Sequence, residues 1–185
     1  MTKENSDEVL RTIIEEKDLK RTIRRLAHEI IEKNKGVENL VAIGIRTRGA
    51  YLAERIIAEI SKIEGVKLPL GMLDITMYRD DFRHRLTQPE IQQTEIPFDI
   101  DEKSIVLIDD VLYTGRTTRA ALEAIMAFGR PSDIQLAVLV DRGGRELPIK
   151  PDYVGLKIAI SLGEQIKLKM KEIDGEDILL LINRT

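Results

Sequence analysis

The sequence contains no cysteine and no tryptophan, and aromatic residues make up 4% of it. Without cysteine the chain can form neither a disulfide bond nor a thiolate metal site, so any metal must be bound through oxygen or histidine. No apolar run approaches the roughly 20 residues that cross a bilayer, and the first ten residues lack a basic segment followed by an apolar one. We therefore expect a cytoplasmic protein without membrane contacts.

The charges of the chain nearly balance. Lysine and arginine total 29 against 32 aspartate and glutamate residues, which gives a net charge of -3. This balance excludes nucleic-acid binding through overall charge, so any contact with RNA requires a local basic patch. The sequence also lacks internal repeats and linkers rich in Pro, Gly and Ser, and we expect residues 1–185 to form a single domain.

The apolar periodicity predicts alternating strands and helices. We expect strands at residues 40–45, 70–77, 104–108 and 134–140, and helices at residues 18–35, 50–63 and 117–128. Asp18 is expected to cap the first helix and Gly36 to end it. This order predicts an α/β fold with a mainly parallel central sheet flanked by helices.

Two other parts of the chain follow different patterns. Residues 78–94 are polar, carry mixed charges and have no clear period, which is typical of a mobile loop. The last third has short apolar runs at residues 153–160, 166–173 and 178–182, and we expect it to form a smaller, strand-rich appendage.

The strongest chemical pattern lies at residues 106–118, which read Val-Leu-Ile-Asp-Asp-Val-Leu-Tyr-Thr-Gly-Arg-Thr-Thr. Ligands of parallel sheets bind beyond the carboxyl ends of the strands, where this pattern places Asp109 and Asp110. The two carboxylates can accept hydrogen bonds from sugar hydroxyls and partly neutralise a bound cation. Thr114, Gly115, Arg116 and Thr117 then turn into a helix, whose free amides bind anions. Each feature alone is more often structural, but together they favour a sugar phosphate.

The complete string resembles the signature of the type I phosphoribosyltransferases. A second candidate anion site, Arg46-Thr47-Arg48-Gly49, follows a predicted strand and occupies the place of the pyrophosphate loop of that family. Backbone amides and two guanidinium groups could meet there. The alternative is an arginine-rich surface turn of no particular function.

A more extensive resemblance, over nearly the whole chain, is to the PyrR family, bacterial attenuators of pyrimidine operons that are also uracil phosphoribosyltransferases. It is carried by residues 24–30, 74–81, 109–117, 129–131, 141–143 and 145–149. Tyr113 supports this choice, because the related 6-oxopurine enzymes carry an aspartate just before Thr-Gly that interacts with the purine. A tyrosine cannot replace that acid near neutral pH.

The resemblance implies that uracil and 5-phosphoribosyl pyrophosphate (PRPP) give UMP and pyrophosphate, with Mg²⁺. It implies that Asp109 and Asp110 hold the ribose and the metal, that residues 114–117 with the neighbouring Tyr113 form the nucleotide site, and that residues 46–49 bind pyrophosphate. Arg79, in the flexible loop, would close over the site and act in catalysis; a solvated loop is the alternative. A small hood over the base and a homo-oligomeric assembly are further implications.

PyrR proteins also bind a stem-loop of the pyr mRNA leader in a UMP-dependent way. On the first helix, one basic face lies opposite the apolar stripe: Arg21, Arg24, Arg25 and His28. Arg145 and Lys150 are candidates to extend it. Such a face can neutralise phosphates and stack on unpaired bases, although an ordinary solvated helix face would look the same. A phosphoribosyltransferase or nucleotide sensor without RNA binding therefore stays open.

The chain departs from the PyrR pattern at two places near the hood. Gly144 stands where the family usually carries histidine, and residues 155–161 read Gly-Leu-Lys-Ile-Ala-Ile-Ser instead of Gly-Lys-Asn-Ile-Pro-Thr-Ser. These positions concern the uracil side of the pocket, so a weak enzyme fits the sequence as well as an efficient one.

Overall fold

The computed structural model describes residues 8–78 and 93–183. Its centre is a five-stranded, wholly parallel sheet with the strand order β3-β2-β4-β5-β6. The strands are β2 (Leu40–Ile45), β3 (Leu70–Leu73), β4 (Ser104–Leu112), β5 (Asp133–Asp141) and β6 (Tyr153–Lys157). β4 lies in the middle, so the strand that carries the two acids has neighbours on both sides.

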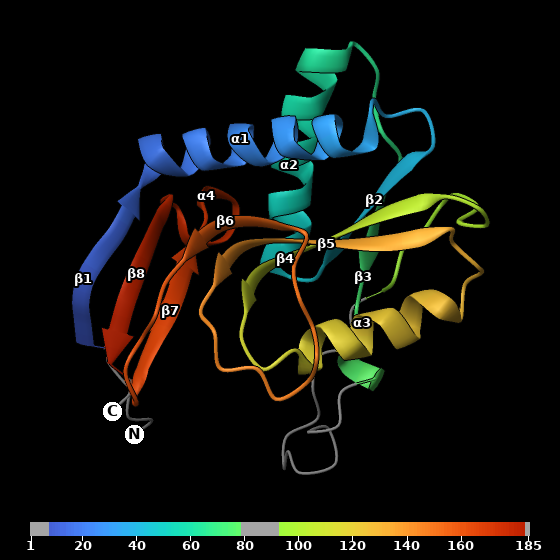
Figure 1. The fold of residues 1–185 in the computed structure, drawn as a ribbon. Coiled ribbons are helices and arrows are strands. Elements are labelled where there is room, and N and C mark those ends of the chain that lie inside the picture. Colours follow the sequence, from blue (N-terminus) through green and yellow to red (C-terminus); the bar gives the residue numbers. More distant parts are fainter. Residues whose placement is uncertain (1–7, 79–92, 184–185) are drawn as a thin grey trace.

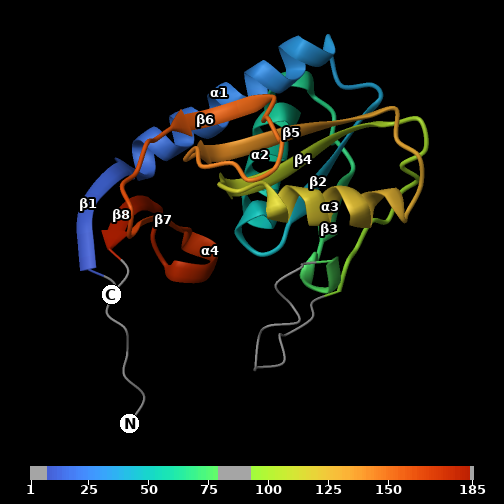
Figure 2. The same cartoon turned by 60° about the horizontal axis from the view of Figure 1, so that its bottom comes forward.

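Helices cover both faces of this sheet, as the alternating pattern predicts (Figure 1). α1 (Glu16–Asn34) and α2 (Arg48–Glu64) lie over one face, and α3 (Arg116–Met126) lies over the other. Figure 2, turned by 60°, shows α3 clearly separated from α1 by the sheet. Within the part of the chain that the structure describes, no helix is long and apolar enough to cross a membrane.

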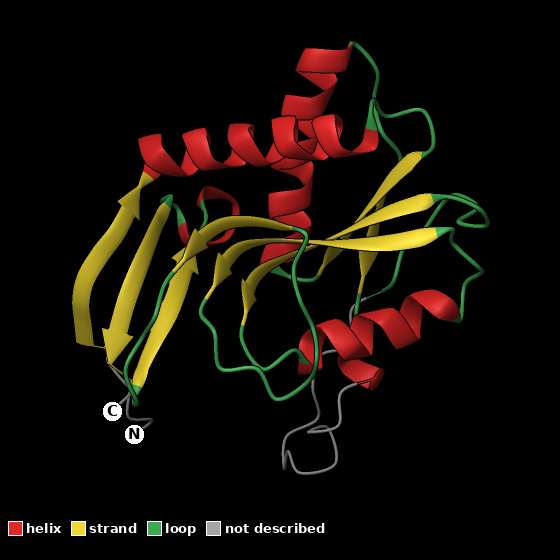
Figure 3. Cartoon of the chain, in the orientation of Figure 1, coloured by secondary structure: helices red, strands yellow, loops and turns green. Residues whose placement is uncertain are grey.

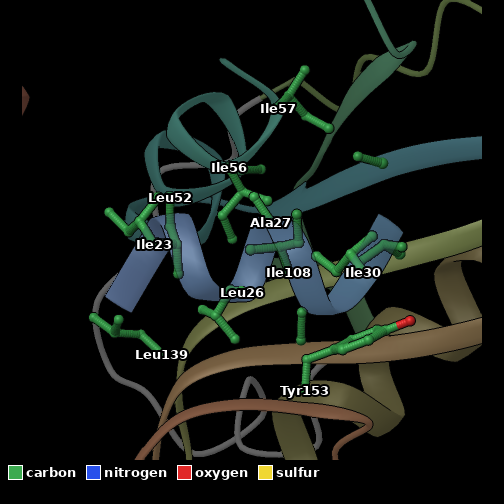
Figure 4. Close-up of a cluster of buried hydrophobic side chains, with 14 of the residues drawn as sticks. Ile23, Leu26, Ala27, Ile30, Leu52, Ile56, Ile57, Ile108, Leu139 and Tyr153 are labelled. Atoms are coloured by element: carbon green, nitrogen blue, oxygen red, sulfur yellow. The ribbon is translucent and has the colours of Figure 1, made fainter. Parts of the chain in front are cut away.

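The two sides of the sheet have separate hydrophobic cores. In the first, Leu26 and Ile30 of α1 and Ile56 of α2 pack over Ile108 and Leu139 of the sheet (Figure 4). In the second, α3 buries alanines and an isoleucine against the opposite face of β4 and β5. Burial on both faces explains why β2 and β4 read as continuous apolar runs rather than alternating ones.

A second, three-stranded antiparallel sheet, here called the hood, stands beside the main sheet (Figure 3). Its order is β1-β8-β7, formed by β1 (Glu8–Glu15), β8 (Ile178–Asn183) and β7 (Glu164–Lys169), with the short α4 (Lys171–Asp174) between β7 and β8. The prediction of a strand-rich appendage is thus confirmed for β7 and β8. It is wrong for β6, which pairs with β5 in the main sheet, and it omits β1.

Several predicted boundaries need correction. α1 begins at Glu16 after Glu15, so Asp18 lies inside the first turn and is not the cap. The strand predicted at residues 70–77 ends at Leu73 and is followed by a 3₁₀ turn, Thr76–Tyr78, because Asp74 accepts hydrogen bonds from the amide and hydroxyl of Thr76. α3, which the periodicity predicts to end at residue 128, ends two residues earlier, at Met126.

Candidate active site

The acid pair, Asp109 and Asp110, lies within β4, whose predicted end was Ile108. Pairing with β2 ends at Ile108, whereas pairing with β5 continues to Leu112. The two acids therefore lie in the part of β4 that pairs with β5 alone. Asp109 is buried, with 6% of its surface exposed, and one of its oxygens accepts the amide of Asp110 at 2.9 Å. Asp110 is half-buried and accepts the amide of Val111 at 2.9 Å. Both acids thus lie near the carboxyl end of β4, inside the strand rather than just after it.

The phosphate turn, residues 114–117, connects β4 to α3. Gly115 has φ 91° and ψ -2°, a left-handed conformation that favours glycine, and α3 begins at the next residue. A Cβ on Gly115 would lie 2.9 Å from the side chain of Ile149. The first amides of a helix lack acceptors within the helix and therefore point outward to an anion. The hydroxyl of Thr118, in the same first turn, is buried without a partner among the described residues.

A bracing loop, residues 142–149, holds the start of the phosphate turn through three consecutive carbonyls. The amide of Arg142 donates to Leu112 O at 3.1 Å. The guanidinium of Arg145 donates to Tyr113 O at 2.9 Å. Thr114 O accepts the amides of residues 146 and 147 at 3.0 and 3.1 Å. The loop thereby fixes the distance between the acid pair and the phosphate turn.

The arginine turn, residues 46–49, lies between β2 and α2 beside the acid pair. The Arg46–Thr47 peptide bond is cis. Gly49 approaches β4 so closely that a Cβ on it would lie 2.7 Å from Ile108 O and 3.1 Å from Asp109 Cα. The structure therefore brings the two predicted anion sites to the same edge.

The two arginines of this turn point to different neighbours. Arg48 donates to Leu168 O of the hood at 2.7 Å and to the carboxylate of Asp174 at 3.1 and 3.2 Å. Arg46 lies 3.8 Å from a carboxylate oxygen of Glu95. Thr47, the N-cap of α2, is exposed and makes no side-chain capping bond. Arg48 thus links the turn to the hood, a role that the sequence pattern does not reveal.

Most of the predicted mobile loop, with Arg79, falls at residues 79–92 and lies outside the described residues. Its flanks are well placed. The guanidinium of Arg119 donates to Tyr78 O at 2.9 Å, which attaches the first flank to α3. Thr94 accepts the amide of Asp74 at 3.1 Å, which attaches the second flank to the end of β3. Both flanks therefore start from the side of the sheet that carries α3.

The basic face of α1 is exposed as predicted, but its members have partners. Arg21 lies 3.3 Å from Asp18, and Arg24 lies 3.3 Å from Glu59 of α2, with about two thirds of each arginine side chain exposed (70% and 68%). Arg25 donates to the carbonyls of Val154 and Gly155 in β6 and to Glu29. His28 is also exposed.

The structure places Arg145 and Lys150 on the chain between β5 and β6 rather than on α1. Lys150 is exposed. Arg145 donates to Ile149 O, Tyr113 O and, at 2.7 Å, to the carboxylate of Asp141. Burial acts to raise the pKa of Asp141, but the hydrogen bonds from the Gly143 amide and Arg145 outweigh it and lower that pKa. Arg145 is therefore engaged with the turn that follows β4 and with the end of β5, not with α1.

Three contacts near Tyr113 were not anticipated. The guanidinium of Arg142 lies 3.8 Å from the centroid of the Tyr113 ring. A Cβ on Gly144 would lie 2.6 Å from the same ring, and Leu147 and Ile149 lie against Gly115. The available signal was that residues 142–149 directly follow a buried strand, where side chains reach the same sheet edge as the acid pair.

At this edge the protein alone supplies only part of the ligands that a divalent cation needs. The described residues contain no group of three or more His, Cys, Asp or Glu side chains that could hold a metal. The acid pair offers carboxylate oxygens, the ligands that Mg²⁺ prefers, and Mg²⁺ commonly completes its shell with water and substrate phosphates. The donor set therefore suits a metal that arrives with a phosphorylated substrate.

Comparisons with known proteins agree with this geometry. The model of the phosphoribosyl transferase domain family matches residues 11–171. The chain is 54% identical to the "Bifunctional protein PyrR" of Deinococcus radiodurans over 172 residues, covering 93% of this chain and 94% of that protein. It is also 54% identical to the protein of the same name from Halalkalibacterium halodurans, covering 95% and 98%.

Solved structures support the fold. The hypoxanthine phosphoribosyltransferase of Trypanosoma cruzi superposes with a TM-score of 0.72 at 16% identity, covering 96% of this chain and 98% of that one. The hypoxanthine phosphoribosyltransferase of Staphylococcus aureus superposes with a TM-score of 0.70 at 20% identity, covering 95% and 94%. At these identities the likeness concerns the fold alone.

Proposed function

The chain belongs to the PyrR family of phosphoribosyltransferase-domain proteins, and we propose that its site makes UMP from uracil and PRPP while the whole protein regulates pyrimidine operons. The single observation that carries the proposed site is the spacing of two features on one edge. The buried Asp109 lies one residue past the part of β4 that pairs with β2, and Gly115 precedes α3 six residues later. One sugar phosphate can span both.

In this reaction a bond forms between a uracil nitrogen and the C1 atom of the ribose, the bond from C1 to pyrophosphate breaks, and the nitrogen releases its proton. The ribose becomes cationic and the leaving pyrophosphate gathers negative charge, so electrostatic placement dominates the catalysis. Asp109 and Asp110 accept hydrogen bonds from the ribose hydroxyls and place their negative charge beside the developing cation. The amides and threonine hydroxyls of the phosphate turn hold the 5'-phosphate.

The pyrophosphate lies, in this proposal, over the arginine turn. The first amides of α2 and Arg46 belong to this turn, and Gly49 lets the turn approach the acid pair. Arg48 acts by fixing the turn to the hood rather than by direct contact. Arg79 and the rest of the loop of residues 79–92 would exclude water from the reacting atoms.

Mg²⁺ would be held by the acid pair and by oxygens of PRPP. When bound, it supplies positive charge that neutralises the departing pyrophosphate. The half-buried position of Asp110 leaves a carboxylate open to such a shared ion.

The regulatory role rests on the basic face of α1. Arg21, Arg24 and His28 are exposed on consecutive turns, and Arg25 attaches this helix to β6, which neighbours β5 and its bracing loop. The proposed RNA contacts are phosphates of the pyr mRNA leader stem-loop and its unpaired bases. Lys150, exposed on the chain between β5 and β6, is a further candidate contact. A regulator of a nascent bacterial transcript acts in the cytoplasm, and we propose that location together with a homo-oligomeric assembly.

Asp109→Asn tests the catalytic part of the proposal. The variant keeps the shape of the side chain but removes its charge, so uracil-dependent release of pyrophosphate should fall by at least about 100-fold. The unfolding temperature serves as the control for intact folding. Unchanged turnover would refute the role given to this carboxylate.

Filter binding with the leader hairpin, with and without UMP, tests the regulatory part. UMP should tighten RNA binding, and by reciprocity RNA should tighten UMP binding by the same factor. Binding that is absent or insensitive to salt would leave the alternative, a phosphoribosyltransferase without an RNA partner.

A further inference from the structure

A cavity of about 460 Å³ lies next to the proposed nucleotide site, between the bracing loop and the chain that enters the hood. Its walls are Tyr113, Arg142 and Gly144 on one side and residues 160–165 on the other. Tyr113 stands between the acid pair and the phosphate turn in the sequence. A sugar phosphate that spans these two features therefore has its remaining substituent, the base on C1, free to enter this cavity.

Arg142 is the cationic group of this cavity, and it has an unusual environment. Its guanidinium lies 3.8 Å from the ring centroid of Tyr113, a cation–π contact that orients the planar group. Its Nε is buried without an acceptor, and its guanidinium makes no hydrogen bond or ion pair within residues 8–78 and 93–183. A buried donor without an acceptor is costly, so a ligand that supplies an acceptor is favoured.

The position of this guanidinium is fixed from two sides. The amide of Arg142 donates to Leu112 O at 3.1 Å, which anchors the residue to the end of β4. Gly144 has φ 73°, and a Cβ on it would lie 2.6 and 3.2 Å from two ring carbons of Tyr113. Glycine thus leaves the space that the tyrosine ring occupies, and a side chain at position 144, such as the histidine that the family usually carries, requires this ring to take another position.

From these contacts we infer that Arg142 reads a carbonyl oxygen of the pyrimidine and is a specificity-determining residue of the site. The inference rests on the proposed function. Arginine is a donor only, so it matches a ring carbonyl of uracil but cannot accept a hydrogen bond from the amino group that cytosine carries at the equivalent position. Tyr113 and Gly144 are positioning residues, because they fix the plane in which the guanidinium meets the base.

Binding of three compounds tests this assignment: UMP, CMP and ribose 5-phosphate, each measured by calorimetry. The wild type should bind UMP about 10- to 100-fold more tightly than CMP, since a mismatched buried hydrogen bond is strongly rejected. Arg142→Met keeps an unbranched apolar stem but removes the guanidinium donors, and the preference for UMP should disappear. Gly144→Ala should reduce the preference by displacing the Tyr113 ring. Arg130→Met, an exposed arginine before β5, is the matched control and should keep it.

The affinity for ribose 5-phosphate reports an intact phosphate site in every variant. The inference is overturned if the wild type does not prefer UMP over CMP, or if Arg142→Met keeps the wild-type ratio. Should Arg142→Met fail to fold, the Gly144→Ala ratio decides in the same way. The binding test and the turnover test can fail separately. If the wild type prefers UMP and Arg142→Met loses this preference, the inference is supported. If the same wild type releases no pyrophosphate with uracil, the proposed reaction is contradicted.

Discussion

Gly49 lies against Asp109: a Cβ on the glycine would stand 3.1 Å from the Cα and 3.4 Å from a carboxylate oxygen of the aspartate. The start of α2 therefore packs directly against the carboxyl end of β4. The proposed pyrophosphate and ribose sites are thus in direct contact. The spacing in the sequence, 60 residues apart, gives no indication of this contact.

Gly49→Ala should accordingly impair catalysis more than stability. The added methyl group would lie 2.7 Å from Ile108 O, so the turn or the aspartate must shift. A shift near 1 Å can cost about 100-fold in rate, and we expect a loss of that order in kcat/KM for PRPP. Gly65→Ala, at the other end of α2, is the matched control: its φ of 72° makes the alanine cost some stability, but the site is distant and turnover should be retained. Wild-type kinetics in Gly49→Ala would contradict the proposal that the close contact between Gly49 and Asp109 positions the two sites.

Arg55 joins α2 to α4 and to the segment that follows it, and this junction should make stability depend on pH. Arg55 donates to both oxygens of Glu172 at 2.9 and 2.6 Å and to Asp177 at 2.7 Å. The hydrogen bond from Arg55 lowers the pKa of Glu172. Burial opposes ionisation of Asp177, whose side chain is 3% exposed, but the bonds from Arg55 and the Lys171 amide outweigh it and lower that pKa too.

Lowered carboxyl pKa values contribute stability above the unfolded-state values near 4, and this contribution is lost as the pH falls through the lower folded-state values. Arg55→Leu should therefore lower the unfolding free energy at pH 7 by about 2 kcal/mol, or the unfolding temperature by about 4–8 °C. The difference from the wild type should shrink toward pH 3. Lys20→Met, which breaks an exposed pair with Glu16, should leave the unfolding temperature almost unchanged at both pH values. A pH-independent difference for Arg55→Leu would argue against this explanation.

The exposed arginines of α1 allow a quantitative test of RNA binding. Replacing both Arg21 and Arg24 by glutamine should weaken binding of the leader hairpin. If each arginine contacts one phosphate, the negative slope of log K against log salt should become shallower by about 0.7 per lost contact. Arg130→Gln, which removes the same charge at a different place on the surface, should leave the slope unchanged. Equal slopes for the double variant and the control would exclude α1 from the RNA interface.

The main sheet and its helices could be predicted because their residues obey simple periods. β2 was predicted to the residue, since both of its faces are buried and its apolar run stops where the sheet stops. The end of β4 could not be predicted, because Asp109 and Asp110 remain in the strand through pairing with β5, a partner about 30 residues away. Polar composition is a poor guide where a strand extends beyond one of its neighbours.

The hood shows the opposite limit. β1 carries four charged or polar residues in eight and is mostly exposed, so neither period nor hydrophobicity marks it as a strand. Its pairing with β8, at the other end of the chain, determines its conformation. Likewise, nothing in the arginine turn reveals that Arg48 bonds to the hood, because its partners Leu168 and Asp174 are 120 and 126 residues away. The acid pair and the phosphate turn could be located because all their parts are local.

The most direct test of the whole account is a crystal structure with UMP bound. We expect the ribose hydroxyls within hydrogen-bonding distance of Asp109 and Asp110, and the 5'-phosphate on the amides of residues 114–117. UMP bound elsewhere, with the edge of β4 and the start of α3 left empty, would contradict the account.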